Sequence, residues 1–277
     1  DDYARKIEQW VEDAAAQGVK LAVFPEYGAM ELASLDPATM GDLAGSMAFV
    51  ASLEGKVDAL HRELAVRHGM YVLAASLPVE RDGEYRNAAR LFSPSGGSGE
   101  QQKLIMTRFE REQWGVRAGG PLRLFDTELG RIGVLICYDS ELPLLGRALV
   151  EAGADIILVP SCTDSAAGYH RVRIGAQARA LEGQCYALQS PTVGMAGWSP
   201  AVDENHGAAG IFGPPDRGFP ESGVVAQGEY DRAGWVFGSV DIDKVAAVRR
   251  DGAVFNLRHW EEQPGARSLP EVDCAIL

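Results

Sequence analysis

Three residues of this sequence have side chains and positions suited to nucleophilic chemistry, and the first is Cys137. It follows an apolar run, Ile132 to Ile136, that predicts a strand buried on both faces, and helical spacing begins at Pro143. A cysteine at such a strand-to-helix turn can present its thiol at the edge of a sheet, beside free backbone N–H groups. A plain buried cysteine is the alternative, because burial is the usual fate of this residue.

Two charged residues could supply what such a thiol needs. Glu26 follows the short apolar run KLAVF, which predicts a strand, and Lys103 lies within the strand-like segment QKLIM. A free thiol titrates near ~8.5, so a nucleophilic cysteine at neutral pH needs a neighbouring base or cation. Glutamate, lysine and cysteine brought together from such positions would form a nucleophilic site with its own base and its own cation.

Four stretches of the sequence resemble a known family. The strings FPEYG, QKLIM and LICYDSELP are similar, in this order, to the three signatures of the nitrilase superfamily, the carbon-nitrogen hydrolases, and point to its amidase-like branch. The later string ARALEGQCYAL resembles the helix-to-strand junction after the nucleophile in that family. One such string alone is a weak signal, but the ordered set is specific. The resemblance covers essentially the whole chain.

The resemblance implies an α/β fold, a four-layer α-β-β-α sandwich of two sheets with helices on their outer sides. It implies one carbon-nitrogen hydrolase domain over residues 1–277. Members of the family usually open with an apolar strand before the first helix, so we expect such a strand upstream of Asp1. Members also pair so that the sheets of two subunits stack, which predicts a homodimer or a higher homo-oligomer. The tail beyond Val254 would then lie across a neighbour or the partner subunit.

The resemblance also implies a mechanism through a Glu-Lys-Cys triad of Glu26, Lys103 and Cys137. Glu26 would take the thiol proton, and Lys103 would stabilise the oxyanion together with the backbone N–H of Tyr138. Ammonia or an amine would leave, and water would hydrolyse the thioester with Glu26 as the base. Burial would raise the pKa of Glu26 and Lys103 would lower it, so the sequence leaves the net direction open. These steps need no metal and no organic cofactor.

Three functions are compatible with this site. The first is hydrolysis of a small amide substrate. The second is a nitrilase or an N-acyltransferase, because the same thioester can be reached from a nitrile or passed to an amine. The third is a non-catalytic scaffold or interaction protein that keeps the fold, against which the intact Glu26, Lys103 and Cys137 argue. Partnership of Cys137 with His170 or His206 is a further possibility, but nothing in the sequence places either beside it.

A second acidic residue is expected beside the lysine. Judged by distance from Gly119, Glu112 resembles the family position more closely, whereas judged by distance from Lys103, Glu110 competes with it. We expect Glu112 in the site. The alternative for both residues is a solvated helix end.

Four further residues are weaker candidates for contact with substrate. Glu141 follows CYDS at a position that resembles a pocket wall, and Cys162 lies just past the end of a predicted strand. Tyr27 and Trp114 could also face the substrate. Packing in the core or at the rim is the usual role of such residues.

Composition narrows the class of protein. The chain has 277 residues, is 46% hydrophobic, and carries a formal charge of −13 from 26 basic and 39 acidic residues. This balance argues against a nucleic acid or an anionic membrane as partner. No apolar run approaches the ~20 residues of a membrane span, and the start lacks a signal-peptide pattern. The cysteines, Cys137, Cys162, Cys185 and Cys274, form no CxxC pair, which fits a protein of the reducing cytoplasm without zinc or disulfides.

The remaining pattern predicts alternating helices and strands. Apolar residues at helical spacing predict helices over Tyr3 to Gln17, about Met47 to His68, and Tyr169 to Glu182. A cluster of glycine and serine at Ser93 to Ser98 predicts a hairpin turn. The string SVDIDKVAAVRR, which resembles a late strand and a last helix of the family, predicts those two elements near the end.

Overall fold

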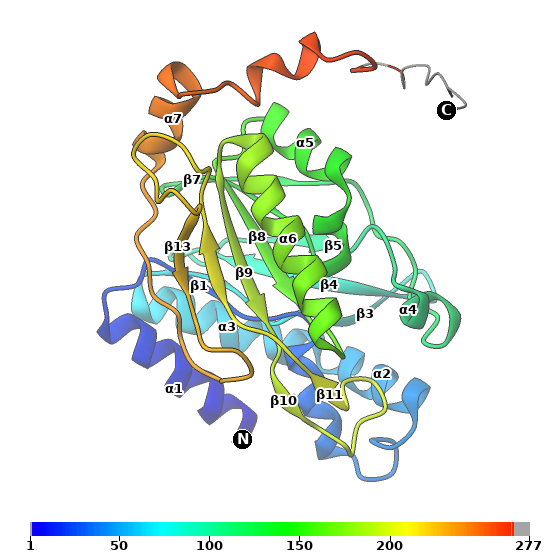
Figure 1. Cartoon of the computed structure of the whole chain (residues 1–277). Coiled ribbons are helices and arrows are strands. Elements are labelled where there is room, and N and C mark those ends of the chain that lie inside the picture. The colour runs from blue at the N-terminus through cyan, green and yellow to red at the C-terminus, as the bar shows by residue number, and fades with distance from the viewer. Residues whose placement is uncertain (1, 267, 269–277) are drawn as a thin grey trace, which may run out of the picture.

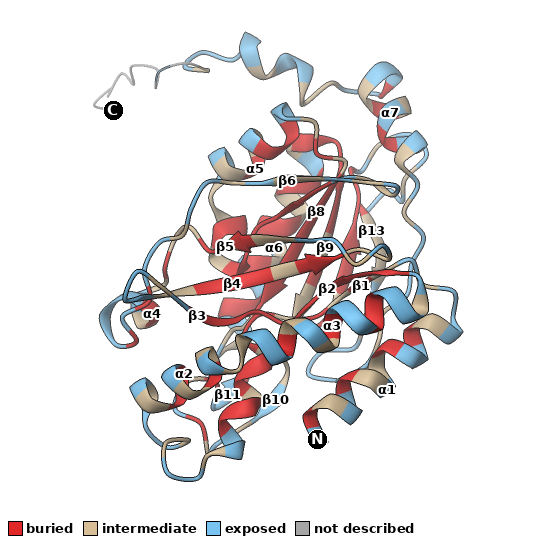
Figure 2. Cartoon of the chain, turned by 180° about the vertical axis from the view of Figure 1, so that it is seen from behind, coloured by how far each residue is buried: buried red, intermediate tan, exposed pale blue. Residues whose placement is uncertain are grey.

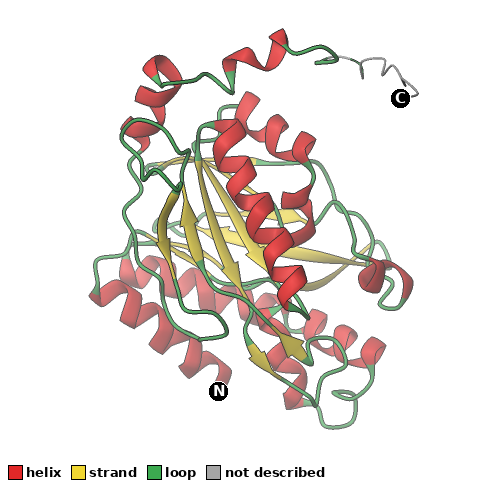
Figure 3. Cartoon of the chain, viewed as in Figure 1, coloured by secondary structure: helices red, strands yellow, loops and turns green. Residues whose placement is uncertain are grey.

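Two β-sheets lie at the centre of the protein, and helices cover their outer sides. The computed structural model describes residues 2–266 and 268, so Pro270 and Cys274 of the predicted contact tail lie outside the described residues. Figure 3 shows the strands of both sheets between helices on two sides. This arrangement confirms the expected α/β fold with its α-β-β-α layers.

The first sheet comes from the N-terminal part of the chain. Its strands are β1 (Leu21–Val23), β2 (Tyr71–Leu73), β3 (Leu77–Arg81), β4 (Glu84–Phe92) and β5 (Ser98–Gln102), in the order β1-β2-β4-β3 with β5 also paired to β4. β1 and β2 are parallel, whereas β4 is antiparallel to its three neighbours. The β4–β5 pair confirms the predicted hairpin. Helices α1 (Asp2–Ala16) and α3 (Glu54–His68) cover the outer face of this sheet (Figure 1).

The second sheet follows and has six strands. Its order is β13 (Val224–Gln227), β12 (Gly210–Phe212), β9 (Tyr186–Pro191), β8 (Ile156–Ser161), β7 (Gly130–Val134) and β6 (Leu124–Thr127). The central strands β7, β8 and β9 are parallel, as their continuous apolar sequences predict. Helices α5 (Pro143–Glu151) and α6 (Ala166–Gly183) lie on the outer side (Figure 1).

Shorter elements connect and flank the two sheets. They are η1 (Gly28–Leu35), α2 (Leu43–Ser52), α4 (Arg108–Glu112), η2 (Cys137–Glu141), β10 (Gly194–Met195), β11 (Glu204–Asn205), α7 (Ile242–Asp251) and η3 (Arg258–Glu262). The two elements that matter most for the site are α4 and η2, which each begin a few residues after a strand ends.

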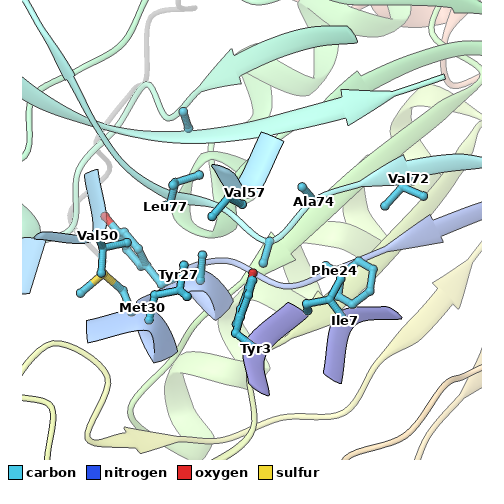
Figure 4. Close-up of a cluster of buried hydrophobic side chains, with 14 of the residues drawn as sticks. Tyr3, Ile7, Phe24, Tyr27, Met30, Val50, Val57, Val72, Ala74 and Leu77 are labelled. Atoms are coloured by element: carbon cyan, nitrogen blue, oxygen red, sulfur yellow. The ribbon is translucent and has the colours of Figure 1, made fainter. Parts of the chain in front are cut away.

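Alternation along the strands divides the core into two clusters. In β2, Val72 packs toward the helices, whereas Tyr71 and Leu73 pack toward the second sheet. Figure 4 shows the helix-side cluster, where side chains of α1 and α3 meet those of the first sheet. Figure 2 shows buried residues concentrated on the strands and on the inner faces of the helices. Each buried Val, Leu or Ile contributes about 1.5–3 kcal/mol relative to an exposed one.

Two predicted elements differ from those observed. The single helix predicted from Met47 to His68 is two helices, because Leu53 ends α2 with a bond from its N–H to the carbonyl of Val50 and then opens α3. Hydrophobic spacing alone did not reveal this break, since both helices turn apolar residues toward the same core. The late strand predicted before α7 is also absent: residues 232–241 are not assigned to a strand. No helix in the described part of the chain combines the length and apolar character that a bilayer crossing requires.

Candidate active site

Cys137 lies on a sharp turn that begins three residues after β7 ends at Val134. Its φ of 52° places it in the left-handed region, where a residue with a Cβ is strained by about 1–3 kcal/mol. The turn is held from below by the hydroxyl of Ser140, which donates to the carbonyl oxygen of Cys137 at 2.7 Å. Such strain persists only where the surroundings fix it, and it is typical of functional positions.

Helix α6 supports this turn from behind. Gly175 comes so close to η2 that a Cβ at this position would lie 2.9 Å from the carbonyl oxygen of Ser140. The guanidinium of Arg179 donates to the same oxygen at 2.9 Å. The close approach therefore requires glycine at 175, and the turn that carries Cys137 cannot move away from α6 without losing a buried hydrogen bond.

Glu26 lies past the end of β1 and points into the interior. Its side chain is 1% exposed, and one carboxylate oxygen accepts hydrogen bonds at 2.8 Å from both Lys103 Nζ and Asn87 Nδ2. Its backbone carbonyl accepts from the hydroxyl of Thr192, at the end of β9, at 2.6 Å. The carboxylate is thus fixed by the first sheet and the backbone by the second.

Lys103 is a buried cation between two carboxylates. Its Nζ lies 2.8 Å from Glu26 Oε1 and 2.7 Å from Glu110 Oε2, and its side chain is 1% exposed. A buried ammonium is stable only when it is paired in this way. The residue stands just after β5 ends at Gln102, so only Gln102 of the strand-like segment predicted over Gln102 to Met106 lies in a strand.

The second acidic residue beside the lysine is Glu110, and the expectation that favoured Glu112 is corrected. Glu110 is 3% exposed, whereas the side chain of Glu112 is 51% exposed and pairs with Arg108 on the surface. Thr107 caps α4, and the carboxylate of Glu110 reaches back to the N–H of Thr107 as the third residue of a capping box. This T-x-x-E pattern was readable in the sequence and would have selected Glu110.

Burial and neighbouring charges set the protonation of the three charged residues. Burial raises the pKa of Glu26 to about 7, with repulsion from Glu110 added and Lys103 acting against it. Burial also acts on Glu110, but Lys103 and the donors around it hold that pKa below its ordinary value. For Lys103, burial lowers the pKa, yet the two carboxylates outweigh burial and keep it well above its ordinary value. The lysine therefore stays charged, and Glu26 can change its protonation near neutral pH.

The thiol of Cys137 is neutral in this environment. Burial, followed by the negative charge of Glu26, raises its pKa well above the ordinary value, and Lys103 only partly compensates. Hydrogen bonding between Cys137 and Glu26 acts on the pKa of both groups. A neutral thiol beside a carboxylate with a pKa near 7 is suited to proton transfer during attack, not before it.

The weaker candidates fall into two groups: Tyr27 and Trp114 pack beside Glu110, and Glu141 lies half-buried near the charged cluster. The hydroxyl of Tyr27 donates to Glu110 at 2.8 Å, and its ring lies 4.7 Å from that of Trp114, whose indole N–H donates to Leu43. Both aromatic residues are buried, and Tyr27, packed against Trp114, holds the carboxylate of Glu110 in place. Glu141 is half-buried, pairs with Arg171 at 3.5 Å, and has a pKa that burial raises and Lys103 lowers. It therefore lies within electrostatic reach of the charged cluster.

Cys162 and Tyr138 flank the thiol. The carbonyl of Cys162 lies 3.6 Å from the sulfur of Cys137, and its own thiol bonds to Asn205. Tyr138 is the second residue of η2, and the first N–H groups of a helix have no partner within that helix. The structure thus brings together Glu26, Lys103, Glu110 and Cys137, with Cys162 and Tyr138 beside them.

Sequence patterns missed two buried polar residues of the site. Asn87 bonds to Glu26 and lies 3.5 Å from Glu110, while its backbone carbonyl accepts from Lys103 N at 2.8 Å. Asp139 accepts from two backbone N–H groups that follow Lys103. An asparagine within a strand and an aspartate after the cysteine carry no pattern of their own, although CYDS placed Asp139 near the turn.

Other arrangements find no support in the described residues. His206 pairs with Asp231 at 2.8 Å, and no cluster of three metal-ligating side chains occurs in residues 2–266 and 268. A cavity of about 1310 Å³ lies between α1, β1 and residues 232–242, and its lining does not include Glu26, Lys103 or Cys137.

Most of the sequence matches the carbon-nitrogen hydrolases. The profile of that family, described as carbon-nitrogen hydrolase, matches residues 1–231. The chain belongs to this family. The expected membership is thereby confirmed.

Curated relatives carry related names. The chain is 35% identical over 260 residues to "Probable hydrolase YhcX" of Bacillus subtilis, covering 93% of this chain and 50% of the relative. It is 31% identical over 201 residues to the "Bifunctional nitrilase/nitrile hydratase NIT4" of Oryza sativa, covering 67% and 54%. The chain thus spans about half the length of these relatives.

Solved structures share the fold at lower identity. The nitrilase-superfamily member Nit3 of Saccharomyces cerevisiae superposes with a TM-score of 0.70 at 17% identity, covering 89% of this chain and 86% of that one. An amidase from Nesterenkonia sp. superposes with a TM-score of 0.64 at 20% identity, covering 89% and 86%. A variant of that amidase carries a covalent adduct described as lying at its active-site cysteine. These likenesses establish the nitrilase type of fold.

Proposed function

We propose that this protein hydrolyses the carbon-nitrogen bond of a small amide through a thioester on Cys137. One observation carries the proposal: Lys103 is buried between Glu26 and Glu110, and Glu26 interacts with the Cys137 thiol. A scaffold protein has no use for a buried ammonium and two buried carboxylates beside a strained cysteine, since buried charges are costly to stability. An acyl-transfer site has a use for each.

Acylation begins with proton transfer from the Cys137 thiol to Glu26. The sulfur attacks the amide carbon, and the carbonyl oxygen becomes an oxyanion that Lys103 and the Tyr138 N–H stabilise. When the tetrahedral intermediate collapses, the carbon-nitrogen bond breaks and Glu26 returns its proton to the leaving nitrogen. Ammonia or an amine departs, and the acyl group remains on Cys137 as a thioester.

Deacylation repeats these steps with water. Glu26, again a carboxylate, takes a proton from water as its oxygen attacks the thioester carbon, and Lys103 stabilises the second oxyanion. Collapse breaks the carbon-sulfur bond, and Glu26 protonates the departing sulfur. The carboxylic acid leaves, and the thiol is restored without a metal or an organic cofactor.

Glu110 acts in this scheme by holding the cation. Its capping box and its bond from Tyr27 fix the carboxylate, which in turn fixes Lys103 Nζ. Glu110 stays ionised while Glu26 holds the proton, so Lys103 keeps a negative partner and acts as a fixed cation and not as an acid.

A second candidate reaction is nitrile hydrolysis, or transfer of the acyl group to an amine. The similarity to the relative named a bifunctional nitrilase/nitrile hydratase, at 31% identity, favours nitrile hydrolysis as this second candidate. Addition of the same sulfur to a nitrile carbon would give a thioimidate, and addition of water with loss of ammonia would then give the same thioester.

A substrate screen tests the proposal. Small amides and nitriles would be incubated with the protein, ammonia release would be measured, and the acyl-enzyme would be trapped and weighed by mass spectrometry. We expect ammonia from at least one small amide and an acyl adduct on Cys137. Turnover of nitriles alone would favour the second candidate, and absence of both ammonia and adduct would favour a scaffold.

We also propose a cytoplasmic homodimer or higher oligomer. Free Cys137, Cys162 and Cys185 fit a reducing compartment, and the exposed apolar side chains of Leu144 and Ile174 on α5 and α6 are suited to contact with a second subunit. Light scattering at micromolar concentration tests this assembly, and an active monomer would contradict it.

A further inference from the structure

The cation and the thiol of the proposed site come from different sheets. Lys103 follows β5 of the first sheet, and Cys137 follows β7 of the second. An oxyanion can be stabilised by Lys103 only if its ammonium and the attacking sulfur keep a fixed separation, and a displacement of ~1 Å can cost about 10²-fold in rate. A bond between the two loops is needed to hold that separation.

The side chain of Asp139 forms such a bond. It is 1% exposed and accepts from the backbone N–H of Ile105 at 2.8 Å and from that of Leu104 at 3.2 and 3.1 Å. Asp139 is two residues after Cys137, and its two donors immediately follow Lys103. One carboxylate therefore joins the turn that carries the thiol to the loop that carries the cation.

Each of the two loops is anchored by its own set of hydrogen bonds. The N–H of Lys103 donates to Asn87 on β4, and its carbonyl accepts from Gly119, both at 2.8 Å. The Cys137 turn is held to α6 through Ser140 and Arg179. Asp139 lies between these two sets of bonds, so it fixes one set relative to the other.

Burial of this carboxylate is costly unless its bonds compensate. Burial raises the pKa of Asp139 to about 6, while the two N–H donors and the Lys103 charge act in the opposite direction. Hydrogen bonds to a charged acceptor are stronger than those between neutral groups. A buried carboxylate two residues after a strained cysteine therefore has a role beyond its backbone bonds in η2.

We infer that Asp139 is a positioning residue that sets the separation of Lys103 and Cys137 across the two sheets. This inference rests on the proposed function for its kinetic consequence, but not for its structural one. Asp139 does not touch the reacting atoms; it acts through the backbone of the residues after Lys103.

Two substitutions at this position separate geometry from charge. Asp139→Asn removes the charge but keeps an oxygen at Oδ1, which lies within 3.2 Å of both donors. Asp139→Ala removes the acceptor altogether. We expect kcat of Asp139→Asn to stay within about threefold of the unmodified enzyme, and kcat of Asp139→Ala to fall by about 10²-fold with KM little changed.

A matched control removes the same kind of bond elsewhere. Asp216 lies in the loop after β12, outside the charged cluster. It accepts from the backbone N–H of Arg217 and from that of Ala253, which follows α7. Asp216→Ala should lower the thermal midpoint without changing kcat. Equal losses of kcat in Asp216→Ala and Asp139→Ala would mean that a general loss of stability explains both, and would overturn the inference.

The readouts distinguish this inference from the proposed function. Steady-state kinetics would be measured with the best substrate of the screen, and hydrogen exchange of the Leu104 and Ile105 amides would be measured in all variants. We expect faster exchange at both amides in Asp139→Ala and near-normal exchange in Asp139→Asn. If the unmodified protein turns over no substrate, the proposed function fails while the exchange data still test the link.

Two results would overturn the inference itself. One is a folded Asp139→Ala with unmodified kcat and unmodified exchange at Leu104 and Ile105. The other is an equal loss of kcat in the Asn and Ala variants, since a charge effect and not a positioning effect would then be at work. Should Asp139→Ala fail to fold, Asp139→Ser, whose hydroxyl is too short to reach both donors, serves in its place with the same expected loss and the same contradicting result.

Discussion

The two sheets of this protein hold their parts of the site in different ways. The first sheet supplies charge: Glu26 and Lys103 stand past the ends of β1 and β5 and are fixed by side-chain bonds to each other, to Asn87 and to Glu110. The second sheet supplies the thiol of Cys137, whose strained backbone is held by the hydroxyl of Ser140 and by the contact of the turn with α6. The charged side chains of the first sheet are thus held mainly by bonds to one another, whereas the neutral thiol is held by the backbone conformation of its turn.

This difference teaches how the two halves should respond to substitution. In the first sheet, loss of one charged group leaves its partners buried and unpaired, which affects stability as well as rate. In the second sheet, replacement of the sulfur leaves the turn intact and affects rate alone. Substitutions at four positions test this contrast, from the largest expected effect to the smallest.

The largest effect is expected at Cys137. Cys137→Ala should reduce turnover by roughly 10⁴-fold or more and abolish the acyl adduct, because no other group can carry the acyl chain. Its thermal midpoint should stay close to that of the unmodified protein, as calorimetry would show. Cys185→Ala, at a buried thiol outside the cluster, is the control and should stay active. Substantial activity in Cys137→Ala would exclude the proposed nucleophile.

The next effect is expected at Glu26. Glu26→Gln should keep the fold and lose about 10²- to 10⁴-fold in rate, because an amide cannot accept the proton of the thiol or of water. Burst experiments would separate the two half-reactions, and both should slow. If only deacylation slowed, the thiol would have another base.

Substitution of Lys103 should affect both rate and stability. Lys103→Met removes the cation and should cost about 10²- to 10³-fold in rate, the scale of an oxyanion donor. It also leaves two buried carboxylates unpaired, which should lower the free energy of unfolding by about 3–5 kcal/mol at neutral pH. This loss should shrink at lower pH, where the carboxylates take up protons.

Lys103→Arg separates charge from shape. A planar guanidinium cannot place a compact charge between Glu26 and Glu110, so this variant should lose rate as well while recovering part of the stability. Denaturant titration and steady-state rates would be compared across the variants. Near-normal rates in either would remove the lysine from the mechanism.

The smallest effect is expected from a matched pair on α4. Glu110→Gln should slow turnover by about tenfold or more, because Lys103 loses a partner, whereas Glu112→Gln on the exposed face should change little. The pH dependence gives a second measure. Glu26 must be ionised to act, and its pKa is raised to about 7, so kcat/KM should rise with pH through about 7.

Glu110→Gln should shift this rise to lower pH. Glu110 raises the pKa of Glu26 by repulsion, so its removal lowers that pKa, while Lys103 and Cys137 continue to face Glu26. Tyr27 and Cys162 keep raised pKa values and stay neutral in this range, whereas Asp139, whose pKa burial raises to about 6, also titrates near it. A rise that moved upward in Glu110→Gln would contradict the assigned electrostatics.

Much of the site could be predicted from the sequence, because a change from apolar to polar residues marks the end of a strand. Glu26 and Cys137 each follow an apolar run, and that local contrast was enough to place both at a sheet edge. Lys103 was placed near its strand, but its exact position depends on the pairing of β5 with β4, which is not a local property. The choice between Glu110 and Glu112 failed because spacing within a family string was weighed above the capping pattern that begins at Thr107.

Other parts of the site could not be predicted because they depend on tertiary contact. Asn87 and Asp139 acquire their roles only when the two sheets meet, so no window of sequence around either residue signals them. The division at Leu53 is similar, since α2 and α3 present one continuous apolar pattern to the same core. Long-range packing and not local propensity decides these features.

The resting state of the thiol has a consequence for chemical damage. Peroxide attacks thiolates far faster than thiols, and access is needed as well. Cys137 is 3% exposed, and its pKa is held well above the ordinary value by burial and by Glu26. A nucleophile that is ionised only while a substrate is being attacked is therefore protected from oxidants between turnovers, without any dedicated repair of its sulfur.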